Sequence, residues 1–147
     1  MSKPATIMDN LKTLLEDSSD LSYVRDNNIL LGYREGLVRY PMIILEPQEI
    51  VEEDTTHNRQ HLTFTIAVMG FIKVSDKEKQ IVGSGTTKGI LDMLNDVKKA
   101  ISSDRTIDSS AIWTKIVKTN FDIEAYPVRS FTIEIEVEYR QNSTNRT

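Results

Sequence analysis

The segment FTIEIEVEYR, residues 131–140, decides the fold, because large apolar and polar side chains alternate along it without a break. Successive side chains of a β-strand point to opposite faces of its sheet. One face of this strand therefore needs a hydrophobic core, since it consists of Phe131, Ile133, Ile135, Val137 and Tyr139. The other face carries Glu134, Glu136 and Glu138, about 7 Å apart, with no basic residue between them along the chain. This row is either solvated surface or the lining of a passage for something negatively charged.

Length and composition narrow the possible classes of protein. The 147 residues fit one domain of ordinary size. The chain contains no cysteine, which excludes disulfides and thiolate metal sites and favours synthesis in the cytoplasm. No signal-peptide pattern and no apolar run of membrane-spanning length are present, so we expect no membrane association. The net charge of -4 argues against a protein that grips DNA phosphates, but not against one past which DNA slides.

The N-terminal third predicts a helix followed by two strands. Apolar residues recur at helical spacing, which favours an amphipathic helix capped by Thr6 or an earlier residue. These residues are Ile7, Leu11, Leu14 and Leu15. A short strand is expected at 29–31 and a longer one at 37–45. Pro41 cannot donate a ladder hydrogen bond, so we expect the longer strand to be broken there or to lie at an edge.

The stretch from Glu46 to Gln60 is strongly acidic, with five carboxylates before its first basic residue, Arg59. We interpret it as a long, mobile loop, because loops of this length in a compact domain tend to be functional or disordered. Its acidic side chains are candidates for contacts with other proteins. They include Glu49, Glu52, Glu53 and Asp54.

A strand is predicted from His61 to Val74, with Gly70 interrupting it. Fully extended, it would be roughly 46 Å long, longer than the roughly 38 Å diameter of a compact domain of this size. Its second face also becomes apolar around Ala67, Met69 and Phe71. We therefore expect the strand either to bend at Gly70 or to project and be covered by another copy, with Met69 and Phe71 as interface candidates.

The second half of the chain predicts a helix over 87–101, two short strands at 111–117 and 121–125, a turn at 126–129 and then the closing strand. This order predicts an α+β domain over residues 1–140, with a mostly antiparallel sheet packed against two main helices. Residues 141–147 are expected to form a flexible polar tail. The single tryptophan, Trp113, is either a core or cross-strand aromatic or an anchor at a subunit interface.

Two patterns suggest site chemistry, and both fail on closer comparison. The segment Gly83 to Gly89 precedes a helix, but a phosphate-binding loop needs glycine directly before its lysine, and Thr87 stands before Lys88. We interpret it as a flexible connection in which Ser or Thr caps the helix. His57 and His61, four residues apart, could share a zinc ion if they lay on a helix. The flanking acids and the strand that begins at His61 argue against a helix, so we expect a surface pair. No catalytic residue, metal ligand or cofactor site is predicted.

The order of these elements resembles that of the tail terminator (tail completion) proteins of long-tailed bacteriophages and prophages. The resemblance covers roughly residues 5–140 and rests on layout. Its loose markers are Tyr40-Pro41-Met42-Ile43-Ile44, the long polar segment, the strand from His61, the helix Ile90 to Ile101 and the closing Glu138-Tyr139-Arg140.

The resemblance implies a structural protein of the virion tail, assembled in the host cytoplasm. It would form a hexameric ring on the tail tube, stop tube polymerisation and offer a surface for head-tail joining. Its partners would be other copies, the tail tube protein and neck or head-completion proteins, with DNA only as passing cargo. Glu134, Glu136 and Glu138 would line the channel. Two alternatives are another neck or tail-tube component and, from a different class, a small nucleotide-binding domain that uses Gly83 to Lys88.

Overall fold

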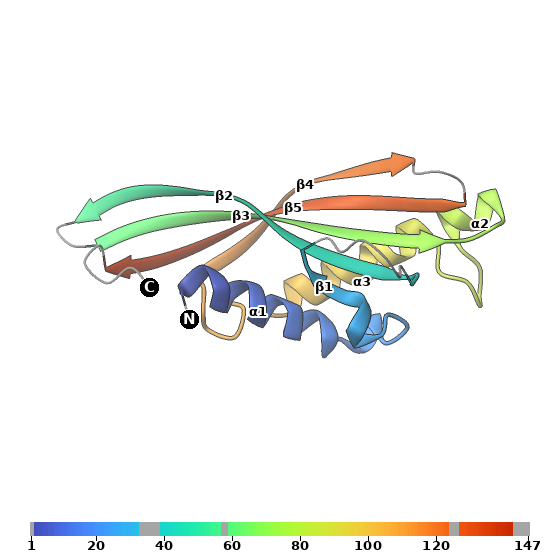
Figure 1. Ribbon diagram of the computed structural model, residues 1–147, viewed down its shortest axis with the longest axis horizontal. Coiled ribbons are helices and arrows are strands. Elements are labelled where there is room, and N and C mark those ends of the chain that lie inside the picture. Colours follow the sequence, from blue (N-terminus) through green and yellow to red (C-terminus); the bar gives the residue numbers. More distant parts are fainter. Residues whose placement is uncertain (1, 33–38, 57–58, 124–126, 143–147) are drawn as a thin grey trace.

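The computed structural model describes residues 2–32, 39–56, 59–123 and 127–142. The long helices α1 (Lys3–Glu16) and α3 (Ile90–Ser103) lie on one face of a five-stranded sheet (Figure 1). Its strands are β1 (Ile29–Leu31), β2 (Met42–Thr56), β3 (Arg59–Lys73), β4 (Trp113–Ile123) and β5 (Val128–Asn142), in the order β1-β2-β3-β5-β4. Among these strands β1 and β2 pair in parallel, and the other neighbours pair antiparallel. The predicted α+β class is confirmed.

The core lies between the helices and the sheet face that we call inner. The five apolar side chains of β5 quoted above are each at most 1% exposed. They belong to one buried cluster with Ile7 and Leu11 of α1 and with Met93 and Val97 of α3. Burying a side chain of this size contributes about 1.5–3 kcal/mol. The alternation in β5 therefore orients the whole sheet, and its polar residues fall on the opposite, outer face.

Both main helices begin at caps that the sequence only partly indicates. The Ser2 hydroxyl accepts a hydrogen bond from the Ala5 amide at 3.2 Å, so α1 starts earlier than Thr6. The helix α3 begins at Ile90 and not at Thr87, because the Gly89 amide donates to the Asp92 carboxylate at 3.0 Å. A short helix that was not predicted, α2 (Lys77–Val82), precedes it.

The predicted acidic loop is wrong. Residues 46–56 continue β2, which pairs with β3 as far as Thr56↔Arg59; residues 57–58 lie outside the described part. A β-bulge between Pro47 and Glu49 accommodates the proline and shifts the alternation of side chains by one position. The strand begins directly after Pro41, so the predicted interruption there marks the start of the strand.

Strand β3 is long and continuous. Of the two alternatives for His61 to Val74, a bend at Gly70 or a projecting strand, the structure has the projecting strand. It runs for 15 residues, through Gly70, and so spans about 50 Å. Gly70 pairs with Phe131 of β5, and a Cβ atom at Gly70 would lie 2.4 Å from the Phe131 ring. The missing side chain therefore makes room for the aromatic ring and does not bend the strand.

One end of the sheet reaches past the start of α1 (Figure 1). We call this end the arm; it consists of residues 49–56 of β2, 59–65 of β3 and 136–142 of β5. The Lys3 ammonium ties α1 to it by donating to the Arg140 carbonyl at 2.6 Å. Gln141 and Asn142, predicted to begin a flexible tail, belong to β5. Residues 143–147 lie outside the described part.

The two short strands predicted after the helices form one strand, β4. It pairs with β5 from Trp113↔Glu138 to Ile123↔Arg129, with a β-bulge between Ile116 and Lys118. This bulge shifts the alternation in the middle of the segment, which is why the pattern looks like two strands. The predicted turn at 126–129 is partly wrong, because Val128 and Arg129 already belong to β5; residues 124–126 are not described.

Candidate assembly surfaces

The three glutamates of β5 lie in a row on the outer face. Glu134 and Glu136 are half-buried and Glu138 is exposed. Across the sheet, Lys118 of β4 pairs with Glu134 and Lys115 pairs with Glu136. No salt bridge within 4.0 Å joins these two pairs in the described part of the chain. The row is therefore flanked by a parallel column of lysines that the sequence alone does not reveal.

Of the two histidines, the structure describes only His61. His61 lies on the outer face of β3, with its Nε2 atom 3.9 Å from the Glu138 carboxylate. His57 lies outside the described residues. Within the described ranges no cluster of three or more His, Cys, Asp or Glu side chains could hold a metal ion, and no helix is long and apolar enough to cross a membrane.

The acidic contact candidates are all on the arm and all exposed. Glu49 and Glu53 share the outer face, since they pair with Thr65 and His61 of β3. Glu52 and Asp54 point to the opposite side. The apolar residues between them, Ile50 and Val51, are 41% and 55% exposed. The arm thus combines a strongly negative charge with two exposed aliphatic side chains.

Met69 and Phe71 lie on the outer face at the other end of β3. They pair with Ile44 and Met42 of β2, which are at most 5% exposed, and are themselves half-buried. The second apolar face of β3 is real, but its own neighbours already cover part of it.

A tight turn positions the start of β4. The Asp104 carboxylate accepts hydrogen bonds from the backbone amides of Asp108 and Thr106 and from the Thr106 hydroxyl. These bonds lower the pKa of Asp104, with the Asp108 amide contributing most. They also hold Ile107, Asp108 and Ser109 at positive φ, a region that costs energy for residues with a side chain. The turn therefore fixes where the strand after it begins.

Trp113 is 52% exposed at the start of β4, which excludes the core alternative. The Arg105 guanidinium lies 5.2 Å from the centre of its ring and donates to the Thr114 carbonyl at 2.9 Å. Three further apolar side chains in this strand or directly before it are 42–49% exposed: Ile112, Val117 and Phe121. None of these three was predicted as a surface residue. The only signal for them was the apolar run around Trp113, which also fits a buried strand.

The Gly83 to Gly89 segment forms a closed connection between α2 and α3. The Ser84 hydroxyl accepts from the amides of Thr86 and Thr87, and the Ser84 amide donates to the Thr87 carbonyl. A Cβ atom at Gly83 or Gly89 would lie within 2.8 Å of backbone atoms of this segment. The glycines are therefore required by close backbone packing. The amides of Ser84, Thr86 and Thr87, which a phosphate loop would offer to its ligand, already bond within the loop.

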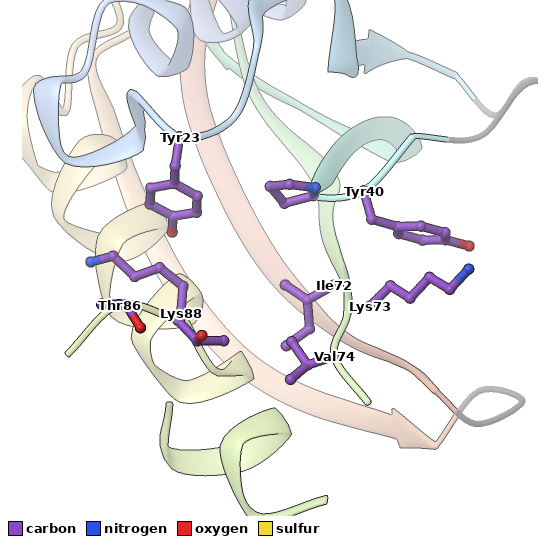
Figure 2. A pocket seen from close by; sticks show the side chains of 9 residues that line it. Tyr23, Tyr40, Ile72, Lys73, Val74, Thr86 and Lys88 are labelled. Atoms are coloured by element: carbon purple, nitrogen blue, oxygen red, sulfur yellow. The ribbon is translucent and has the colours of Figure 1, made fainter. Parts of the chain in front are cut away.

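Beside this connection lies a cleft of about 270 Å³ (Figure 2). Tyr23, Tyr40, Ile72 and Lys88 contribute to its lining. Lys88 lies 3.2 Å from the Asp96 carboxylate and 5.2 Å from the Tyr23 ring centre, and the Tyr23 hydroxyl donates to Asp96 at 2.8 Å. Burial and then the Asp96 hydrogen bond raise the pKa of Tyr23. Lys88 is thus paired with Asp96, with half of its side chain exposed.

The fold defines a class of α+β proteins in which one face of an antiparallel sheet is covered by two helices. It is similar to a chain in the structure described as the virion of a native gene transfer agent (GTA) particle. The TM-score is 0.57 at 8% sequence identity, and the match covers 89% of this chain and 92% of that chain. At this identity the likeness establishes a shared fold. No protein-family model and no curated protein matches the chain.

Proposed function

We propose that this protein is a structural component of a phage-like virion that forms a ring on the end of the tail tube. In that position it stops tube polymerisation and presents the surface to which the head is joined. The observation that carries the proposal is the likeness of nearly the whole fold to a component of a gene transfer agent virion. The predicted resemblance to tail terminators supports the same role, with other copies, the tube protein and neck proteins as partners.

The shape of the sheet supports assembly into a ring. A sheet that extends past its helices and carries exposed apolar residues on both outermost long strands is poorly suited to a solitary molecule. Six copies are the number that the tail-terminator resemblance implies.

In this ring Glu134, Glu136 and Glu138 line the channel. The outer face as a whole is negative, because its seven carboxylates outnumber its five lysine and arginine side chains. A negative wall repels the DNA backbone and so avoids sites at which DNA would stick during passage. Lys115 and Lys118 moderate that potential and do not reverse it.

The test is to co-express the protein with the tail tube protein of the same genome and to image the products by negative-stain electron microscopy. The expected result is tubes of limited length, each with a ring of this protein on one end. A protein that stays monomeric in the presence of tubes contradicts the proposal. If the protein itself polymerises into tubes, the alternative of a tail-tube component is correct.

The nucleotide-binding alternative has a separate test. Lys88 pairs with Asp96, and three amides of the loop before it already donate within the loop. Isothermal titration calorimetry with ATP and with GTP is therefore expected to show no binding. Binding that is lost in Lys88→Ala would support the alternative.

A further inference from the structure

The sheet has two outermost long strands with opposite charge. Strand β1 covers β2 only over Ile43–Leu45, and no described strand lies beside β2 beyond that point. At the other end of the strand order, β4 has β5 on one side and no described strand on the other. Each edge offers 11 residues of strand: 46–56 in β2 and 113–123 in β4.

The strand directions allow these two edges to join. The four long strands β2, β3, β5 and β4 alternate in direction. Because their number is even, β4 of one copy and β2 of the next copy run antiparallel when the copies follow one another in the same orientation. A head-to-tail contact of this kind repeats without limit and can close into a ring.

The charges favour this pairing over pairing of like edges. The β2 edge carries Glu49, Glu53 and Asp54, whereas the β4 edge carries two lysines, Lys115 and Lys118, against one acid, Asp122. Two β2 edges would place carboxylates against carboxylates, which is unfavourable for directly opposed strands. In the mixed contact the lysine column of β4 lies between the glutamate row of its own β5 and the outer-face glutamates of the neighbour's β2.

Apolar residues accompany the charges on both edges. On β2, Val51 is 55% exposed on the outer face, and on β4, Trp113 is 52% exposed on the same face. Val117 and Phe121 add two further exposed side chains to the β4 edge. Charges and bulges at edges also serve to prevent random aggregation. Here the opposite signs make the two edges selective for one another.

From these features we propose that copies of this protein join by antiparallel pairing of the β4 edge of one copy with the acidic β2 edge of the next. The four long strands of each copy then continue as one sheet around the ring. This inference rests on the proposed function for the ring itself and adds the surfaces that form it. The backbone hydrogen bonds of this contact begin near Lys115, since Arg105 already donates to the Thr114 carbonyl, and the Trp113 side chain lies beside their start.

The geometry of a closed ring agrees with this contact. Within one copy, Lys118 lies level with Glu46 through the pairs with Glu134 and Ala67. Placing residues 46–56 beside 113–123 instead sets Lys118 level with Val51 of the neighbour, a shift of about five residues per copy. In a closed ring of six copies with four strands each, the accumulated shift sets the angle between the strands and the ring axis. A shift of this size corresponds to an angle of about 40°. Closed barrels typically have tilts of about 35–45°.

Charge reversal on each edge tests the proposal. The first variant is Lys115→Glu with Lys118→Glu, and the second is Glu49→Lys with Glu53→Lys. Each variant alone opposes like charges, so we expect ring assembly at least about tenfold weaker by mass photometry, more so at low salt. A control matched to the first variant, Lys98→Glu with Lys99→Glu on α3, changes the net charge by the same amount and should assemble as the wild type does.

Mixing the two reversed variants provides the decisive result. Every junction in an alternating ring again joins opposite charges, so assembly should return to within about threefold of the wild type. Rings that form equally well in each variant, or a mixture of folded variants that fails to recover, overturn the edge contact and leave the proposed function standing. A wild-type protein that forms no ring either alone or with tail tubes overturns both.

Discussion

At the scale of single residues, the contact between Gly70 and Phe131 ties sequence most directly to packing. The aromatic ring occupies the space above the glycine on the neighbouring strand, and Phe131 is fully buried. A glycine inside a long strand usually weakens it, since it offers no side chain to pack. In this sheet the cross-strand ring supplies that packing, so β3 continues without a bend.

Replacing Gly70 with alanine is expected to destabilise the protein by about 1–3 kcal/mol, because the new methyl group and the ring cannot both fit. Unfolding in urea measures the change. Gly85→Ala is the matched control, since a Cβ atom there meets nothing within 4 Å; its stability should change by less than about 0.5 kcal/mol. The double variant Gly70→Ala with Phe131→Leu should recover part of the loss. Equal stability of Gly70→Ala and the wild type would contradict this account.

At the scale of elements, the sequence predicted strands where the pattern was unbroken and failed where a bulge shifted it. The closing strand and α1 follow clear periods of two and 3.6 residues and were predicted correctly. Acids on both faces, together with Pro47, hid the second half of β2. Its strand conformation comes from pairing with β3, a contact distant in sequence that local propensity does not contain.

The exposed apolar edge of β4 could not be predicted for a related reason. Val117 and Phe121 also fit a buried strand, and for Trp113 the sequence allows both a core position and an interface position. Only the strand order places β4 at the edge. The row of glutamates on β5 was predicted, but the lysines opposite were not assigned to it. The sheet topology decides which strand lies beside β5, and the sequence of β5 alone does not predict that neighbour.

Hydrogen exchange should separate the edge strands from the central ones. In the monomer, backbone amides on the outer edges of β2 and β4 should exchange faster than those of β3 and β5, which are paired on both sides. On assembly the exchange of both edges should slow by at least about tenfold, while the amides of α1 stay unchanged. Protection that appears in α1 or α3 instead would place the subunit contact on the helices.

At the scale of the whole molecule, the acidic and the basic side chains of the outer face have different proposed roles. The glutamates of β5 would face passing DNA, and the lysines beside them would face the next copy. The two roles are therefore separable by mutation.

Replacing Glu134, Glu136 and Glu138 with lysine should leave the fold and the ring in place and hinder DNA passage. The cost to folding should be about 1–2 kcal/mol, since Lys115 and Lys118 would then face like charges. Thermal unfolding, ring yield and DNA delivery by assembled particles measure the three effects. The control carries the same charge change on exposed acids in the helices or directly after one: Asp9, Asp17 and Glu78. Equal DNA delivery by both variants contradicts the channel assignment.

Trp113 has a spectroscopic consequence. It is the only tryptophan in the chain, so the fluorescence emission at wavelengths longer than that of tyrosine comes from this one indole. With half of its surface in water and the Arg105 guanidinium over its ring, its emission should lie toward longer wavelengths. A neighbouring strand laid against β4 would exclude that water and shift the emission to shorter wavelengths. The protein thus carries its own probe of subunit joining, readable in solution without any label.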